Sequence, residues 1–135
     1  MLGDNVMTRI NVVPPETLSR GHLLGEYHEV LRPLNLVRKA QAKGVNKLNL
    51  SKHYNIPPDY VLGTGHVIFF YNKLWYILKR YRMLQREMTR RGYSFSNLTD
   101  EELIVDLRPE WFGDYEPTEN AIELKTARLI ERTKP

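Results

Sequence analysis

The stretch HVIFFYNKLWYILKRYRMLQREMTRRG, residues 66–92, decides the fold of this chain. Its apolar side chains recur every three or four residues, which is the spacing of one buried helix face. The positions are Val67, Phe70, Leu74, Ile77 or Leu78, Tyr81 and Leu84. Two arginines and then Gly92 end the stretch, as is typical of a helix C-terminus. The pattern predicts one long helix over about residues 66–91.

A second helix is expected closer to the N-terminus, opening at residues 14–17, where two prolines suit a first helical turn. One apolar stripe follows at helical spacing, formed by Leu24, Tyr27, Leu31 and Leu34. Pro33 lacks a backbone N–H, so this helix should kink or end near Arg32. Residues 40–57 are rich in Asn, Lys and Gly and are expected to form a loop.

A third helix is expected near the C-terminus, with Thr118 as its N-cap and with Ile122 and Leu129 turned inward. No run of alternating apolar and polar residues is long enough to indicate a strand. The chain has 135 residues, 41% of them hydrophobic, which suits one domain with one core. The sequence therefore predicts an all-α, compact single domain of three main helices.

Composition excludes several classes of protein. The chain has no cysteine, which rules out disulfides, thiolate zinc sites and cysteine nucleophiles. No apolar run approaches the roughly 18 residues of a membrane span, and the first residues lack the basic and apolar regions of a signal peptide. We therefore expect a soluble, cytoplasmic protein without a membrane span, although composition alone does not distinguish nucleic acid from an anionic membrane surface as its partner.

Motifs for metals and nucleotides are weak. The four histidines lack metal-ligand spacing, although His22, Glu26 and Glu29 share roughly one helix face and could bind a divalent cation. Such a set is more often a hydrogen-bonded polar cluster, so we expect no metal and no cofactor. Residues 63–65, Gly-Thr-Gly, suit either a turn or the approach of backbone to a phosphate.

Charge is distributed unevenly along the chain. Residues 94–123 contain nine acids and one base, and the other 105 residues contain 19 bases and 7 acids. This asymmetry suggests a basic face for a polyanion, with the acidic segment turned elsewhere, and the alternative is a solvated charged surface. The expected helix over 66–91 carries Lys79, Arg80, Arg82, Arg86, Arg90 and Arg91, and the last helix adds Lys125, Arg128 and Arg132. Few acids intervene, so these basic stripes look unpaired and favour phosphate contacts.

Five short segments carry a family resemblance. They are MTRIN (7–11), HLLGEYHE (22–29), LGTGHVIFFYNKL (62–74), GDY (113–115) and ARL (127–129). Together they closely resemble the small phage pyrimidine-dimer DNA glycosylase/AP lyase, the phage endonuclease V family. The resemblance implies a three-helix protein whose N-terminal segment threads between the helices. It also implies an enzyme that removes one base of a UV-induced cyclobutane pyrimidine dimer and cleaves the strand at the abasic site.

The resemblance also implies roles for individual residues. The nucleophile of the family is the α-amine of a threonine that matches Thr8, and its essential carboxylate matches Glu29. Its DNA contacts match Arg9, His22, Arg32, Arg128 and Arg132, and we add Lys73 and His28. The family has arginine in place of His28 and glutamine in place of Gly21, and its aromatic C-terminal tail has no counterpart up to Pro135. These departures leave the lesion-strand contacts and the lesion preference open. The expected partner is double-stranded DNA that contains a lesion and not a membrane, and the protein is expected to be a monomer.

An imine mechanism can be derived from amine chemistry alone. A chain-terminal amine, with a pKa of about 7.7–8.0, is roughly 10–15% neutral at pH 7, whereas a lysine is only about 0.04% neutral. A terminal amine is therefore the better nucleophile at C1′, and a carboxylate such as Glu29 can move the protons. Without the resemblance, a surface carboxylate paired with Arg32 would be the more natural interpretation of Glu29.

Thr8 is internal in this sequence, so its nitrogen is an amide. Either translation starts at Met7, or the leader is trimmed, or this form is inactive as a lyase. We favour the start at Met7 and treat residues 1–7 as a leader and 8–135 as the domain. The alternatives are a glycosylase/lyase for other lesions and a DNA-binding protein that has lost catalysis.

Overall fold

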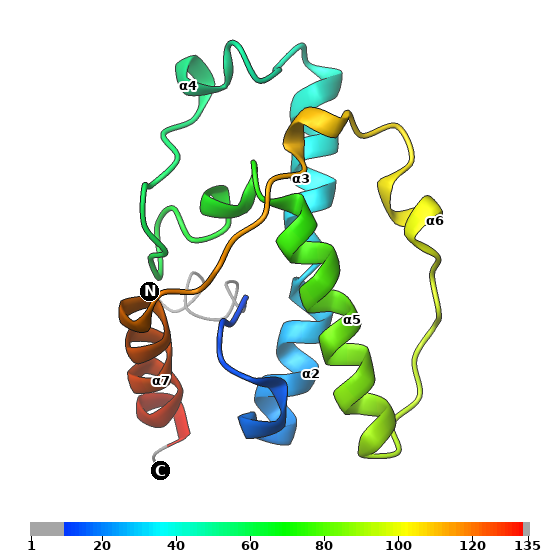
Figure 1. Ribbon diagram of the computed structural model, residues 1–135, viewed down its shortest axis with the longest axis vertical. Helices are drawn as coiled ribbons and strands as arrows, with labels where there is room; N and C mark the ends of the chain where they lie inside the picture. Colours follow the sequence, from blue (N-terminus) through cyan, green and yellow to red (C-terminus); the bar gives the residue numbers. More distant parts are fainter. Residues whose placement is uncertain (1–9, 134–135) are drawn as a thin grey trace.

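The computed structural model in Figure 1 describes residues 10–133, with side chains as far as residue 130. Its α-helices are α2 (Arg20–Glu29), α3 (Arg32–Ala42), α4 (Leu50–His53), α5 (Leu74–Arg90), α6 (Asp100–Ile104) and α7 (Glu119–Thr133). Short 3-10 turns, η1 (Pro15–Thr17), η2 (Ile68–Phe70) and η3 (Pro109–Trp111), lie between them. The described residues form helices and loops without a strand, which confirms the all-α prediction.

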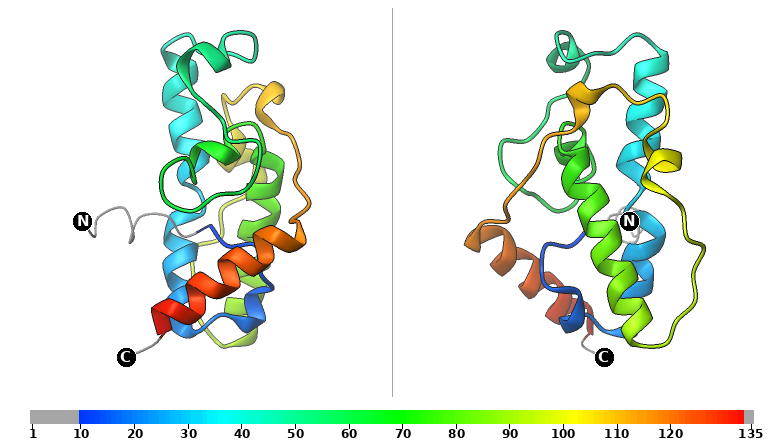
Figure 2. Two further views of the ribbon diagram at one scale, coloured as in Figure 1. Left: turned by 90° about the vertical axis from the view of Figure 1, so that its left-hand side faces the viewer. Right: turned by 45° about the vertical axis from the view of Figure 1, so that its right-hand side comes forward.

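Helix α5 occupies the centre of the molecule. Helices α2 and α3 follow one another along one side of it, and α7 lies apart from them across the lower half (Figures 1 and 2). The segment that leads from residue 10 to η1 runs between α7 on one side and α2 and α5 on the other. This path confirms the expectation that the N-terminal segment threads between the helices.

The predicted break near Arg32 is confirmed, because α2 ends at Glu29 and α3 begins at Arg32 with Pro33 in its first turn. The predicted start is wrong. Residues 15–17 form the separate turn η1, and α2 begins only after Ser19, whose hydroxyl accepts from the backbone N–H of His22 at 3.2 Å. The Ser19 hydroxyl can accept this hydrogen bond at the start of the helix, whereas a proline side chain has no acceptor.

The central helix is shorter than the periodicity predicts, since α5 begins at Leu74. Gly113 explains the late start. Its N–H donates to the carbonyl of Asn72 at 3.2 Å, and its own carbonyl accepts from the N–H of Trp75 at 3.1 Å. A Cβ at Gly113 would lie 2.4 Å from the Asn72 oxygen, so only glycine allows this approach. The Asn72 carbonyl and the Trp75 N–H, which would bond within a continuous helix, are thus used in a tertiary contact with Gly113.

The buried face of α2 also differs from the predicted stripe. Leu23, Glu26 and Val30 are fully buried there, whereas Leu24 and Tyr27 are half-buried. The shift follows from Glu26, a charged residue that an ion pair keeps inside the core. Residues 40–57 are not entirely loop, because α3 continues to Ala42 and α4 adds one turn.

The N-cap of the last helix is confirmed, since the Thr118 hydroxyl accepts from the Ala121 N–H at 3.0 Å. The inward face is corrected in part, since Leu129 is half-buried and packs against the core as expected. Helix α7 turns Ala121 and Lys125 toward the molecule, and Ile122 is 37% exposed. Lys125 is therefore buried and does not join Arg128 in a solvent-facing basic stripe.

Candidate active site

Residues 10–13 continue the chain from the predicted nucleophile Thr8 and are buried in the middle of the molecule. Thr8 and Arg9 themselves lie outside the described residues. Ile10 is 1% exposed and Asn11 is 2% exposed. Because buried backbone polar groups must find partners, this segment depends on donors and acceptors from the rest of the fold.

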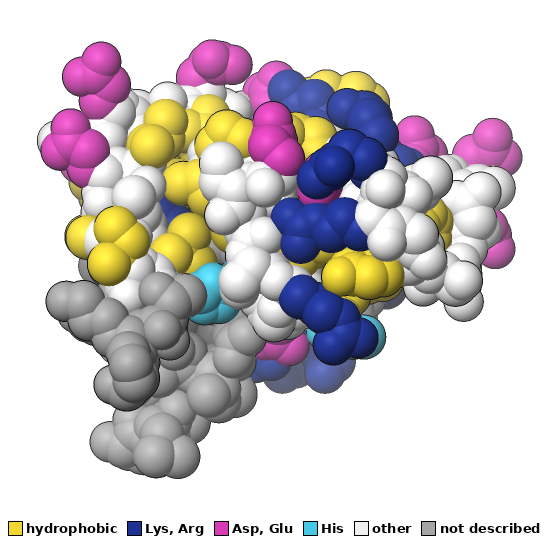
Figure 3. Space-filling model, turned by 90° about the horizontal axis from the view of Figure 1, so that it is seen from below, with side chains coloured by type: hydrophobic (Ala, Val, Ile, Leu, Met, Phe, Trp, Pro, Cys, Tyr) yellow, Lys and Arg dark blue, Asp and Glu magenta, His cyan; other side chains and the backbone are white. Residues whose placement is uncertain are grey.

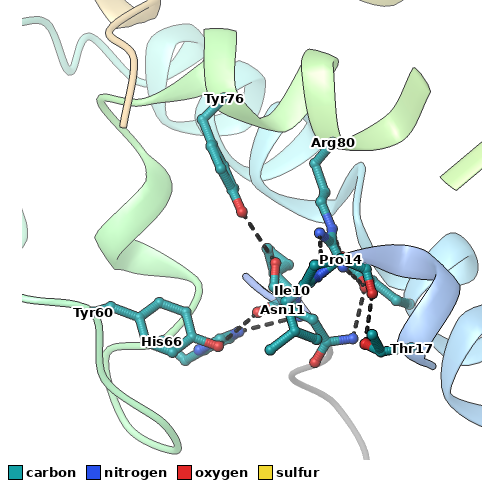
Figure 4. Close-up of polar contacts among 10 residues, drawn as sticks. Ile10, Asn11, Pro14, Thr17, Tyr60, His66, Tyr76 and Arg80 are labelled. Carbon is teal, nitrogen blue, oxygen red and sulfur yellow. Dashed lines mark hydrogen bonds and ion pairs between the residues drawn. The ribbon is translucent and has the colours of Figure 1, made fainter. Parts of the chain in front are cut away.

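Ile10 is held at both of its backbone polar groups (Figure 4). Its N–H donates to Nε2 of His66 at 3.2 Å, and its carbonyl accepts from the Tyr60 hydroxyl at 2.9 Å. One residue further along, the Tyr76 hydroxyl donates to the carbonyl of Asn11 at 3.1 Å. These contacts fix the path and the orientation of the peptide groups at the start of the described chain.

A buried ion pair between Glu26 of α2 and Arg80 of α5 supplies the other partners. The Glu26 carboxylate accepts from Nε of Arg80 at 2.7 Å and from its Nη2 at 2.9 Å. It also accepts from the Asn11 backbone N–H at 3.1 Å and from the Asn11 side-chain amide at 2.6 Å. Nη1 of Arg80 donates to the carbonyl of Val13 at 2.7 Å. We call Glu26, Tyr60, His66, Tyr76 and Arg80 the N-terminal anchor.

His66 takes part in the anchor as a neutral imidazole. Burial lowers the pKa of this histidine to about 4. Nδ1 lies 2.7 Å from the carbonyl of Val61, to which it donates, so Nε2 keeps a lone pair for the Ile10 N–H. Gly65, in the turn before His66, has a positive φ of +89°. A Cβ at Gly65 would lie 3.0 Å from Cγ of Pro57. The Gly-Thr-Gly motif is thus a turn that places His66 against the N-terminal segment.

Glu29 is the last residue of α2, one turn beyond Glu26, and its side chain is half-buried. Within the described part of the chain it forms no hydrogen bond or ion pair, so its pairing with Arg32 is not observed. A carboxylate at a helix C-terminus also faces the negative end of the helix dipole. No described residue therefore holds the Glu29 carboxylate in place.

Several predicted site residues lie on α2 or at the break between α2 and α3. His28 and Arg32 are exposed on either side of Glu29, and the His28 ring lies 6.1 Å from the ring of Tyr27. His22 lies in the first turn of the same helix, about two turns from Glu29. Arg128 lies on α7 and is half-buried.

Lys73 lies just before α5 and has partners within the fold. The Lys73 ammonium donates to the Phe69 carbonyl at 3.0 Å and to Oδ1 of Asn72 at 2.9 Å, and it lies 4.0 Å from the centre of the Phe69 ring. Burial lowers the pKa of Lys73. Much of its donor capacity is therefore used inside the fold, and its role in DNA binding stays a prediction. The side chain of Arg132 lies outside the described residues.

The basic stripe on α5 is not unpaired, which corrects the sequence-based expectation. Lys79 pairs with Asp114 at 2.6 Å, and Arg82 pairs with Asp100 at 2.7 Å. Glu87 accepts from Arg90 and Arg91, and these hydrogen bonds lower its pKa to about 2. The acidic segment therefore lies against the basic helix and neutralises part of it, rather than being turned elsewhere. The sequence hid the partners of Lys79 and Arg82 because they lie 35 and 18 residues away, whereas Glu87 lies within about one helical turn of Arg90 and Arg91.

The weak metal hypothesis gains no support. The residues that the structure describes contain no group of three His, Cys, Asp or Glu side chains placed to hold a metal ion. Glu26, which the hypothesis required, gives both oxygens to Asn11 and Arg80. No helix between residues 10 and 133 has the length and apolarity that a membrane crossing needs.

Comparison with known families identifies the chain at this point. A family model described as pyrimidine dimer DNA glycosylase matches residues 7–101. The chain belongs to this family. The protein is therefore a DNA repair glycosylase and AP lyase, which excises a base at a pyrimidine dimer in damaged DNA and cleaves the strand there. The matched range includes Thr8, Glu29 and the whole N-terminal anchor, and it ends before α7.

The sequence-based search missed the anchor of this glycosylase as a functional group. One signal could have found it, because Glu26 interrupts the apolar face between Leu23 and Val30, and Arg80 interrupts the face between Ile77 and Leu84. A charged residue inside an apolar stripe is rarely buried unless it is paired. Two such residues of opposite sign in one small protein predict a buried ion pair.

Proposed function

We propose that the glycosylase attacks C1′ of the damaged nucleotide with the α-amine of Thr8, and that Glu29 carries the protons. The observation that supports this best is the N-terminal anchor, which holds Ile10 only two residues from Thr8. Two residues span at most about 7 Å, so a chain that began at Thr8 would start within that reach of Ile10. Glu29 lies one helical turn, about 5 Å, beyond Glu26, which holds Asn11.

The chemistry requires only these two groups of the chain. The neutral amine forms a bond to C1′ while the glycosidic bond breaks and the base leaves with a proton. Opening of the sugar ring gives an imine, and loss of a C2′ proton then expels the 3′ phosphate. Glu29, which has no partner among the described residues, can accept and return the protons and stabilise the iminium charge.

The amine exists only if Thr8 begins the chain. We propose that the active form starts at Thr8, either because translation begins at Met7 and that methionine is removed, or because the leader 1–7 is trimmed. A chain that begins at Thr8 keeps every residue of the described fold, 10–133.

We further propose that the glycosylase binds duplex DNA as a monomer through basic side chains on α2, at the break between α2 and α3 and on α7. Of these, His28 and Arg32 are exposed, and His22 and Arg128 are half-buried. His22, His28, Arg32 and Arg128 lie in the described region, and Arg9 and Arg132 extend the set from outside it. Seen from below, where α5 ends and α2 begins, lysine and arginine side chains also form a band across the surface (Figure 3). Exposed cations in such a band suit phosphate contacts.

Borohydride trapping on a duplex with one abasic site tests the proposal. Two proteins are compared, one beginning at Thr8 and one keeping residues 1–7, each verified by intact mass. The first should give a covalent adduct on the Thr8 peptide, and the second should give little or none. Equal adduct yields would show that another amine attacks, and no adduct from either protein would leave DNA binding without lyase chemistry.

A further inference from the structure

The contact between His66 and Ile10 has a consequence for the direction of the chain toward Thr8. The Ile10 N–H belongs to the planar peptide group that also contains Cα of Arg9. Whatever fixes the direction of this N–H fixes that plane. Only three soft torsions then separate the plane from the α-amine of Thr8.

His66 is the anchor residue that binds closest in sequence to Thr8. It accepts the Ile10 N–H, whereas Tyr60 binds the carbonyl of Ile10 and Tyr76 that of Asn11. The imidazole itself is held firmly, because its Nδ1 donates to Val61 and its ring packs edge-on against Tyr60 and Phe70 at 5.3 and 5.7 Å. A fully buried ring with both nitrogens bonded can transmit a fixed orientation to its partner.

We infer that His66 is a positioning residue of the glycosylase, which aims the Thr8 amine at C1′ by fixing the Arg9–Ile10 peptide plane. This inference rests on the proposed role of the Thr8 amine. Glu26 and Arg80 hold the segment as a whole, and His66 sets its final direction. A misplacement of about 1 Å can slow an oriented reaction about 100-fold, so loss of this one contact should act mainly on the rate of imine formation.

Two substitutions of His66 separate its two hydrogen bonds. His66→Asn keeps an amide at the position of Nδ1, which can donate to Val61, but it is too short to reach Ile10. His66→Gln places its terminal oxygen close to the position of Nε2, where it can accept the Ile10 N–H, and it gives up Val61. If His66 positions the amine, Asn should slow imine formation by about 10- to 100-fold and Gln by less than about fivefold.

A matched pair of tyrosines gives a milder second test, in case the histidine variants fold poorly. Tyr60→Phe and Tyr76→Phe each remove one buried hydroxyl that donates to a backbone carbonyl, at Ile10 and Asn11 respectively. The two variants should lose similar stability. Positioning predicts that Tyr60→Phe, whose partner lies nearer to Thr8, slows imine formation more than Tyr76→Phe does.

All variants are made in the chain that begins at Thr8 and compared by single-turnover trapping, duplex binding, urea unfolding and mapping of the adduct. The expected result is an adduct on Thr8, rates ordered as above, and duplex affinity within about threefold of wild type. Rates that follow the loss of stability, with the adduct still on Thr8, would overturn the positioning role alone. An adduct on another amine would overturn this inference together with the proposed function.

Discussion

Glu26 and Glu29 are the same residue type on the same helix, three positions apart, and the fold treats them in opposite ways. Glu26 is fully buried and accepts from four N–H donors of Asn11 and Arg80. Glu29 is half-buried and has no partner among the described residues. A buried carboxylate with all of its lone pairs engaged stabilises structure, and a carboxylate left without partners is available for proton transfer. The contrast separates a residue that builds the site from one that we propose acts in it.

Glu29→Gln removes the carboxylate that we propose carries the protons, and of the changes considered it should reduce activity most. Base removal should fall by about 10²–10⁴-fold, because the amide keeps the size of the side chain but cannot exchange the proton. Lesion binding and urea unfolding should stay close to wild type, since no described residue depends on this carboxylate. A single-turnover rate of base removal within about threefold of wild type would contradict the role of Glu29.

Glu26→Gln removes the charged partner of Arg80 in the N-terminal anchor. The change leaves the Arg80 guanidinium buried and unpaired, which typically costs about 3–5 kcal/mol of stability. Urea unfolding should show this loss directly, and activity should fall only as far as the folded fraction does under the assay conditions. A variant as stable as wild type would mean that Arg80 finds another partner.

Acid should weaken the anchor through His66. Its pKa of about 4 lies below the ordinary 6.5, so the folded protein binds fewer protons than the unfolded chain. Stability is then fully present above about pH 6.5 and declines as the pH falls toward 4, by at most about 3 kcal/mol. Urea unfolding from pH 7 to pH 4 measures this decline. His66→Gln should flatten the curve in this range, and an unchanged slope would mean that His66 does not control it.

The smallest change is expected at the surface, where Arg128 is proposed to contact DNA and Lys79 is paired within the fold. Arg128→Ala should reduce the slope of log affinity against log salt by about one unit, on damaged and undamaged duplex alike. Lys79→Ala is the matched control, because Lys79 pairs with Asp114 and should leave the slope nearly unchanged. Equal slopes for Arg128→Ala and wild type would remove Arg128 from the DNA surface. Arg132→Ala should act like Arg128→Ala if it also contacts phosphate.

The features that were predicted correctly from the sequence are those that neighbouring residues determine. The break at Pro33, the cap at Thr118 and the buried face of α5 follow from one residue or one periodic stripe. The late start of α5 was missed because Gly113, some 40 residues away, takes the backbone groups of Asn72 and Trp75. Such a contact leaves no mark in the periodicity of residues 66–73.

The candidate site divides in the same way. Thr8 and Glu29 came from resemblance to a family, since nothing local separates Glu29 from an ordinary surface carboxylate. The partners of Glu26 and the acidic partners of Lys79, Arg80 and Arg82 lie 15 to 54 residues away, so the pattern on each helix could not show them. The sign of a charge on a helix face can be read locally, and whether it is neutralised is settled by tertiary contacts.

The anchor joins the first described residues to partners that the ribosome makes much later. Ile10 waits for Tyr60 and His66, 50 and 56 residues on, and Val13 waits for Arg80, 67 residues on. At about 5–20 residues per second, synthesis of those 67 residues takes about 3–13 s. During that interval the start of the nascent chain lacks Tyr60, His66 and Arg80. If the active form begins at Thr8, as we propose, this separation in sequence leaves time for the leader to be removed before the anchor forms.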